Sequence, residues 1–581
     1  MGAAPKSGHG ETRAFSVLDH VQTRLTGLSH KATGFVSQPE PRTIGSHARG
    51  RQMVAGNFRL GGHLVQAPDT SIWDIAAPDP LFEADRQGFT WLDDLAKITD
   101  GSTRRLAQAW LNSWIDRYGK GKGLGWAPQL VGRRVIRWIN HAVFLLNAQS
   151  VDNSRAYFTS LSHQTNFLAL RASGAPVGLP RFEALTGLLY ASVSLEGMVG
   201  YLAPATRALA RECDAQIDEQ GGLPTRNPEQ LMDVLINLNW AISALREHEQ
   251  EVPGELVQAV RRALPTLIAL RHADGGLARF HGGGRGAEGQ LDYAISSSLR
   301  HLPPAEMDML IERNVTNERP GAAMGYTAIN QGRTSLITDT AAPPKERASA
   351  DAHASTLAFE LTSGRHQVVV NCGSGNSFGA DWRRAGRATP SHSTLSVLGI
   401  SSAKLSSIHS GEYLIQSAQD VRIAALPESP DAGLIAAHDG YVRDLGLTHI
   451  RKLELAGMGR ELRGEDTFCA ISEPDRRIFE TKMNQTALEG VTYALRFHLH
   501  PDIESSLDMG GTAVSMALKG GEIWVFRFSG AARLSLDPSV YLESGRIKPR
   551  ASKQIVLTAR LMEYAGHINW TLIRAREASR R

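Results

Sequence analysis

The chain has 581 residues, of which 42% are hydrophobic and 21% charged. This ordinary composition excludes collagen, wholesale disorder and a long coiled coil. At about 100–200 residues per domain, the length predicts two or three domains. The 63 Lys and Arg side chains against 59 Asp and Glu give a net charge of +4, which does not indicate a nucleic-acid partner.

The cysteines and the apolar stretches indicate in which cellular compartment the protein is found. The three cysteines are too scattered for a disulfide framework or a CxxC zinc site. The most apolar stretch, residues 188–204, is interrupted by Glu196 and several glycines, so we expect no transmembrane segment. The N-terminal segment has no apolar run, and we therefore expect no secretory signal and a cytoplasmic protein.

An all-α domain is predicted for residues 61–310, behind a partly disordered lead-in over residues 1–60. In and just after the lead-in, residues 14–34 have the pattern of a helix and residues 57–75 that of one or two short strands. Beyond them, apolar residues recur at helical spacing in several stripes joined by short Gly and Pro loops. We expect antiparallel helix pairs, wound into a toroid-like ring or packed as a bundle. The clearest stripe is Leu231, Val234, Leu235, Leu238, Ile242 and Leu245.

The period of apolar residues falls to two in the remaining part, residues 320–581, where we expect a large antiparallel β-sandwich. A hairpin is predicted around the turn at Ser363 and Gly364. Clear helical periods are absent from this half. Further strands are expected over residues 394–398, 420–425, 449–455, 492–500, 512–518, 522–528, 554–561 and 568–574.

A group of histidines in the β half is a candidate metal site. His353 precedes the first strand of the hairpin, Asn371 ends the second strand, and His392 precedes the next one. Polar groups at neighbouring strand ends can converge, and two imidazoles with one oxygen or sulfur ligand suit zinc. Zinc is therefore a candidate cofactor. The alternative is that these histidines cap strand ends in a hydrogen-bonded niche.

Three residues between these histidines are candidates for binding an acidic sugar. Arg383 and Arg387 could hold a carboxylate or sulfate, because guanidinium groups match oxyanions, and the ring of Trp382 could stack on a sugar face. The alternative is a solvated loop with one structural ion pair.

Two loops of the helical half are further candidates. Arg226 adjoins the N-terminus predicted for a helix, where anions bind, although Asn227 followed by Pro228 is a capping signature that explains this loop by itself. A Gly-rich segment carries His272 and His281, which could act as acid or base. The alternative there is a flexible turn with surface histidines.

Several strings of the β half together resemble the C-terminal domain of heparinase II/III-type polysaccharide lyases. The main ones are AHASTLAFE at 352–360, VVVNCG at 368–373 and RATPSHSTL at 387–395. The resemblance covers about residues 320–575 and extends to the helical half through domain order. It implies an N-terminal (α/α) toroid followed by an antiparallel β-supersandwich.

The resemblance also implies β-elimination on an acidic, uronate-containing glycan in the cleft between the two halves. That reaction needs a group that neutralises the carboxylate, a base for the C5 proton and an acid for the leaving oxygen. It makes a periplasmic location an alternative to the cytoplasm, and a homodimer is left open. The candidates are His272, His281 and Tyr326 for proton transfer; Arg226, Asn227, Trp382, Arg383 and Arg387 for substrate binding; and His353, Asn371 and His392 for zinc.

The sequence departs from the family pattern at functional positions. Asn371 stands where the family has Asp, although Cys372 could replace it as a ligand, and Asp351 stands where the family often has His. Residues 226–231 resemble a segment that carries a catalytic Tyr in the family, and no Tyr is present there. One rival hypothesis is therefore a non-catalytic glycan-binding or envelope-associated scaffold.

A second rival is a glycoside hydrolase on the same helical scaffold. Asp214 and Asp218 would supply its carboxylate pair, because helical spacing would place both on one face.

Overall fold

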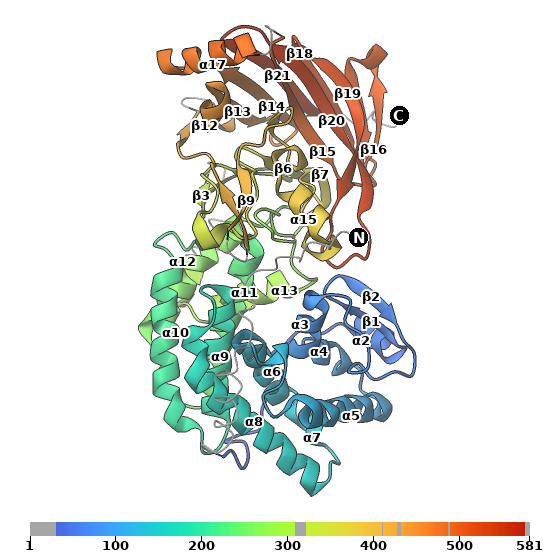
Figure 1. Ribbon diagram of the computed structural model, residues 1–581, viewed down its shortest axis with the longest axis vertical. Helices are drawn as coiled ribbons and strands as arrows, with labels where there is room; N and C mark the ends of the chain where they lie inside the picture. The colour runs from blue at the N-terminus through green and yellow to red at the C-terminus, as the bar shows by residue number, and fades with distance from the viewer. Residues whose placement is uncertain (1–30, 308–320, 409–410, 427–430, 486–488, 576–581) are drawn as a thin grey trace.

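The computed structural model describes residues 31–307, 321–408, 411–426, 431–485 and 489–575. A helical half and a β half lie end to end along the long axis of the molecule (Figure 1). The helix predicted over residues 14–34 falls almost entirely outside the described residues. Within them, no helix is long and apolar enough to cross a membrane.

The N-terminal half is built from helices, as its periodicity predicts. Side-chain caps begin several of them, and Asn227 accepts hydrogen bonds from the backbone N–H groups of Glu229 and Gln230, which confirms its predicted role as an N-cap. The helices are α2 (His47–Val54), α3 (Pro80–Gly88), α4 (Trp91–Leu95), α5 (Gly101–Tyr118), α6 (Pro128–Asn140), α7 (Ala142–Leu146), α8 (Val151–Arg171), α9 (Leu179–Ser194), α10 (Leu202–Gln216), α11 (Pro228–Glu247), α12 (Gly254–Ala269) and α13 (Gln290–Leu299).

Close backbone contact joins the central helices α6 and α9. A Cβ atom added to Gly187 would lie 2.4 Å from the Cα atom of Gly132, a distance that side-chain carbons do not tolerate. These two glycines let the helices approach until their neighbours pack as one core. The adjacent core is rich in tryptophan, and its fully buried members are Trp91, Trp114, Trp126 and Trp138.

One buried cation lies in this aromatic core. The guanidinium of Arg134 is fully buried, 4.1 Å from the ring centroid of Trp114. It donates to the side-chain oxygen of Gln164 and to the carbonyls of Gln87 and Gly125. No carboxylate among the described residues pairs with it, and burial holds the pKa of Arg134 well below its ordinary value.

Two antiparallel sheets form the C-terminal half, which confirms the α-then-β fold. One has the order β19-β20-β15-β7-β6-β5-β4-β3 with β8 on β15, and the other β11-β12-β13-β14-β21-β18-β17-β16. The first comprises β3 (Gly321–Ala323), β4 (Tyr326–Gln331), β5 (Thr334–Asp339), β6 (Phe359–Ser363), β7 (His366–Val370), β8 (Leu395–Val397), β15 (Val491–Leu499), β19 (Arg533–Tyr541) and β20 (Arg550–Leu561). The second comprises β11 (Val421–Ala425), β12 (Ala432–Tyr441), β13 (Leu447–Ala456), β14 (Glu461–Cys469), β16 (Glu504–Asp508), β17 (Ala513–Ala517), β18 (Ile523–Gly530) and β21 (Ala565–Arg574).

The core of the β half lies between these two sheets. Side chains that alternate along the strands meet there, and the rings of Phe359 and Trp570 stack with centroids 5.7 Å apart. The β half also carries a separate two-stranded ribbon, β9 (Lys404–Ile408) and β10 (Gly411–Ile415).

Three local predictions are wrong. Helices α15 (Ala380–Arg387) and α17 (Glu473–Gln485) lie in the half where no helix was expected, and α15 also excludes the solvated loop given as the alternative for the segment of Trp382, Arg383 and Arg387. Both are rich in charged residues, so apolar periodicity gives little signal. Helix α10 ends at Gln216, so Asp218 is not on the same helix as Asp214. The glycoside hydrolase hypothesis required both carboxylates on one helix face, and this prediction is therefore wrong.

The two halves share an extended contact. The apolar core of the helical half continues into strand residues Tyr326, Ala328 and Ile337. A hairpin at the end of the lead-in and just after it, β1 (Asn57–Leu60) and β2 (His63–Gln66), confirms the short strands expected there. It also contacts the β half, because a Cβ atom added to Gly62 would lie 2.4 Å from the Cβ atom of Ser377.

Candidate functional site

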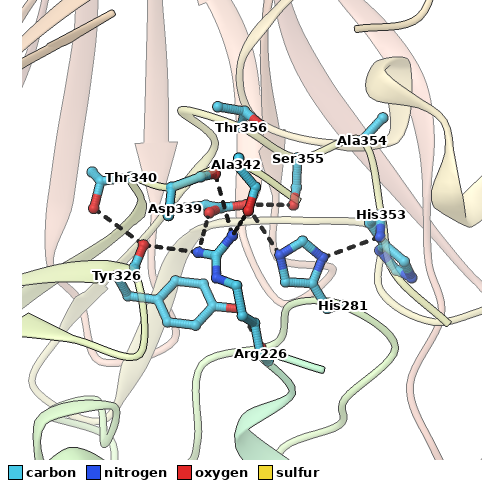
Figure 2. A network of polar contacts seen from close by, with 12 residues as sticks. Arg226, His281, Tyr326, Asp339, Thr340, Ala342, His353, Ala354, Ser355 and Thr356 are labelled. Atoms are coloured by element: carbon cyan, nitrogen blue, oxygen red, sulfur yellow. Dashed lines mark hydrogen bonds and ion pairs between the residues drawn. The ribbon is translucent and has the colours of Figure 1, made fainter. Parts of the chain in front are cut away.

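Arg226 lies at the junction of the two halves and binds the β half through five hydrogen bonds (Figure 2). It precedes α11, and its guanidinium donates to four backbone carbonyls and to Oδ1 of Asp339, at 2.5 Å. Asp339 ends β5 and is fully buried. Burial would raise the pKa of this carboxyl, but Arg226 and His281 hold it well below its ordinary value.

Tyr326 and His281, two of the proton-transfer candidates, are part of the same network. The hydroxyl of Tyr326 donates to the carbonyl of Arg226, and its ring lies 4.7 Å from the guanidinium carbon. Nδ1 of His281 accepts from the backbone N–H of His353 at 3.1 Å. The imidazole proton is therefore assigned to Nε2, which lies 3.4 Å from Oδ2 of Asp339. Both side chains are buried.

The predicted zinc ligands His353 and His392 do meet. Nδ1 of His353 lies 3.0 Å from Nε2 of His392, whose Nδ1 lies 3.0 Å from the carbonyl of Ala388. Because a carbonyl can only accept, the proton of His392 is assigned to Nδ1, which donates to Ala388. Its Nε2 is then an acceptor, so the proton of His353 is assigned to Nδ1, which donates to His392. Burial lowers the pKa of His353 well below its ordinary value and that of His392 to about 3.

The remaining donors do not complete a zinc site. Oδ1 of Asn371 accepts from the backbone N–H of Ser393 at 3.0 Å. The sulfur of Cys372 lies 3.6 Å from Nδ1 of His498, so it is engaged on another histidine. In the described parts of the chain, no group of three or more His, Cys, Asp or Glu side chains could hold a metal ion. These residues do not fit the four-ligand set that zinc requires, so the zinc expected from the sequence has no supporting geometry here.

His272 lies in a second buried network beside the first. Its Nδ1 is 2.8 Å from the hydroxyl of Ser335, and its Nε2 is 3.4 Å from Oε2 of Glu360. The same carboxylate accepts from the backbone N–H of Arg279 at 2.9 Å. His272 is buried, and its turn is packed against the β half rather than free at the surface.

The other predicted binding residues are dispersed. Arg387 is buried and donates to the carbonyls of Ser349 and Ala352. Arg383 pairs with Glu412, and the ring of Trp382 is about one third exposed on α15. Together with the N-cap Asn227, these residues hold structure locally and do not face one common cleft.

A large cleft lies elsewhere, between the helical half, the hairpin β1–β2 and the loop after β19. Its volume is about 980 Å³. None of the residues predicted for the site lines it, and no histidine is among the described residues that do. The charged and aromatic lining residues are Arg49, Arg59, Arg137, Arg279, Arg285, Asp85, Asp93, Glu229, Glu288, Glu543, Trp240, Tyr293 and Tyr541.

Burial and neighbouring charges shift the pKa values of several groups that line this cleft. Asp85 accepts from the backbone N–H of Gly61, and Glu229 accepts from that of Gly284, both at 2.7 Å. Burial raises the pKa of each carboxyl, which favours the neutral form. Burial and the nearby Arg546 and Arg49 lower the pKa of Arg59, while Glu543 acts against them.

Comparison with known proteins confirms the resemblance drawn from the sequence. Residues 314–571 match the family model described as Heparinase II/III-like, C-terminal. The protein therefore has a heparinase II/III-like C-terminal domain, joined here to a helical N-terminal half.

Whole-chain comparisons give two kinds of relative. FtsZ-localized protein C of Caulobacter vibrioides (strain NA1000 / CB15N) is 29% identical over 583 residues, which cover 98% of this chain and 95% of that protein. Among solved structures, a Heparinase III has a TM-score of 0.66 at 13% identity and covers 96% of this chain and 89% of its own. The chondroitin AC lyase of Streptomyces coelicolor A3 has a TM-score of 0.51 at 13% identity, over 98% and 81%. These two structures establish the lyase-type toroid and β-sandwich as the fold.

Proposed function

We propose that this protein binds an acidic saccharide in the 980 Å³ cleft and does not cleave it by β-elimination. The observation that carries this proposal is where the predicted acid–base residues lie. His272, His281 and Tyr326 are buried in networks between the two halves, while the described lining of the cleft has no histidine. The lyase fold then serves as a binding scaffold.

Elimination requires a base and an acid within hydrogen-bond reach of the sugar. The Tyr326 hydroxyl already donates to a backbone carbonyl, Nδ1 of His281 accepts from the backbone N–H of His353, and Nε2 of His281 lies 3.4 Å from Asp339 without a hydrogen bond. Both groups are buried beside the ion pair of Arg226 and Asp339 that joins the halves, away from the cleft lining. We therefore assign Tyr326 and His281 a structural role.

The cleft itself has the groups that bind acidic sugars. Guanidinium groups match carboxylates and sulfates, and the aromatic rings of Trp240, Tyr293 and Tyr541 offer faces for sugar rings. Asp85 and Glu229 can hydrogen-bond to hydroxyl groups. This combination supports binding of an acidic sugar.

Elimination is the second candidate function, because one tyrosine does line the cleft beside a guanidinium. The ring of Tyr541 lies 4.1 Å from the guanidinium carbon of Arg279, and a tyrosine could serve as base. Burial, however, raises the pKa of Tyr541, which disfavours the phenolate that a base requires.

A test of both candidates combines absorbance and binding. Purified protein is mixed with heparan sulfate, chondroitin sulfate and a non-sulfated uronate polymer, and the ultraviolet absorbance of unsaturated product is followed. We expect no increase with any polymer, while affinity electrophoresis shows retardation by at least one. An increase in absorbance that Tyr541→Phe abolishes would establish the lyase instead.

We further infer that the protein localises with FtsZ, as the printed name of its Caulobacter vibrioides relative says of that protein. The match over nearly the whole of both chains supports this inference. A fluorescent fusion expressed together with labelled FtsZ tests it, and a diffuse signal in cells with assembled FtsZ would contradict it.

A further inference from the structure

We propose that Arg279 is the residue that binds the acidic group of the saccharide, a carboxylate or sulfate on a sugar ring. This inference rests on the proposed binding function of the cleft. Arg279 follows α12 in the Gly-rich segment, lines the cleft and is only 4% exposed. It is thus a buried cation placed at the wall of a cavity.

Two of the three guanidinium nitrogens of Arg279 are unused. Nη2 donates to the carbonyl of Asn371. Among the residues that the structure describes, neither Nε nor Nη1 has a hydrogen-bond partner. Glu360 forms an ion pair with Arg279, but its Oε1 lies 3.6 Å from Nε, beyond hydrogen-bond distance. Buried donors without partners are costly, and an oxyanion in the cleft would satisfy them.

The other buried arginines of the junction make an informative contrast. Arg226 uses Nε, Nη1 and Nη2 on carbonyls and on Asp339, and Arg387 uses all three nitrogens on carbonyls. Neither lines the cleft. Arg279 therefore differs from these two both in its position and in its unused donors. Among the described residues, the buried Arg86 and Arg134 also have a nitrogen without a partner, but of the three only Arg279 lines the cleft.

Arg279 is also held in place before any ligand arrives. The ring of Tyr541 lies 4.1 Å from its guanidinium carbon, and the bond to Asn371 fixes the far side. Gly373, at φ +96°, leaves room for Nη1, because an added Cβ atom would lie 2.7 Å from that nitrogen. A fixed guanidinium loses little conformational entropy when it binds an anion.

Arg285 adds positive charge beside this position. It lines the cleft, and its Nη1 lies 2.7 Å from Oδ2 of Asp274. Both Arg279 and Arg285 act on the Tyr541 hydroxyl, and each favours its charged form against the effect of burial. The site is thus suited to one oxyanion, with the aromatic lining left for the sugar.

Isothermal titration calorimetry with matched ligands and variants tests this assignment. The ligands are a non-sulfated uronate hexasaccharide, its sulfated counterpart and its carboxyl-reduced form. The variants are Arg279→Gln, Arg279→Lys and, as a matched control, Arg59→Gln. Arg59 lines the same cleft but is exposed, so its loss reports only the general charge of the cleft.

We expect Arg279→Gln to weaken binding of the acidic hexasaccharide by roughly tenfold or more, the loss typical of a hydrogen bond to a charged group. Its binding of the carboxyl-reduced form should be unchanged, and Arg59→Gln should have a much smaller effect. Arg279→Lys keeps the charge and lacks the planar group, so it should show a partial loss. If Arg279→Gln does not fold, Arg279→Lys provides the test in its place. A larger loss on the sulfated ligand than on the non-sulfated one would assign a sulfate to this position.

Two results would overturn the assignment while leaving the cleft function intact. Arg279→Gln and Arg59→Gln could weaken the acidic ligand equally, or Arg279→Gln could weaken acidic and carboxyl-reduced ligands alike. If wild-type protein binds none of the three ligands, the proposed function itself is wrong.

Discussion

The bond between Arg226 and Asp339 should be a principal connection between the two halves. Arg226→Met removes five hydrogen bonds and leaves the carboxylate of Asp339 fully buried, with Ser355 and His281 as remaining partners. Removing one partner of a buried ion pair typically costs about 3–5 kcal/mol. We therefore expect a loss of this size in the free energy of unfolding.

A double-mutant cycle separates the ion pair from general disruption. Asp339→Asn removes the charge that Arg226 neutralises, so Arg226→Met combined with Asp339→Asn should cost clearly less than the sum of the single changes. The exposed pair of Arg271 and Asp292 is the control, and Arg271→Met should cost about 0–1 kcal/mol. Urea denaturation followed by circular dichroism and tryptophan fluorescence gives all four values. Additive effects, or a cost for Arg226→Met no larger than the control, would refute the reasoning.

Three further predictions concern other buried groups. Because burial lowers the pKa of His392 to about 3 and that of His498 to about 4 from 6.5, the unfolded state binds more protons. The stability these residues contribute is complete above pH 6.5. It should fall by about 1.4 kcal/mol per pH unit per histidine as the pH drops toward 4, and a flat urea-denaturation profile over pH 6.5–4.5 would contradict this. Arg134→Met removes a buried charge without a described carboxylate partner, but it also leaves the side-chain oxygen of Gln164 and the carbonyls of Gln87 and Gly125 without their donor. Thermal unfolding should therefore show a loss of about 1–3 kcal/mol, and a neutral or stabilising effect would contradict this. Metal analysis should find well under one zinc per chain in wild type and in His353→Ala alike. About one zinc that the variant loses would show that a third ligand completes the site.

Strand positions were the most predictable part of the fold. The strands expected over residues 449–455 and 492–500 coincide with β13 and β15, because one face of each strand packs in the sandwich core and imposes a period of two. Helices α15 and α17 escaped prediction because they are rich in charged side chains and lack an apolar stripe at helical spacing.

The site was less predictable because local sequence patterns do not indicate which distant segments of the chain come into contact. His353 and His392 do meet, as strand-end positions suggested, but nothing local indicates that the halves close over them. In the Gly-rich segment, His272 and His281 were predicted as site residues, but it is Arg279 of this segment that lines the cleft. Tyr541 joins it from a strand end far along the chain, and only tertiary packing brings the two together.

The central claim is that a lyase fold here binds an acidic saccharide without breaking it. Mass spectrometry of the ligand after prolonged incubation tests this claim most directly, with an acidic hexasaccharide shown by calorimetry to bind. We predict that the ligand is recovered at its original mass. Two fragments whose masses sum to that of the ligand would show elimination, fragments heavier in sum by one water would show hydrolysis, and either result would contradict it.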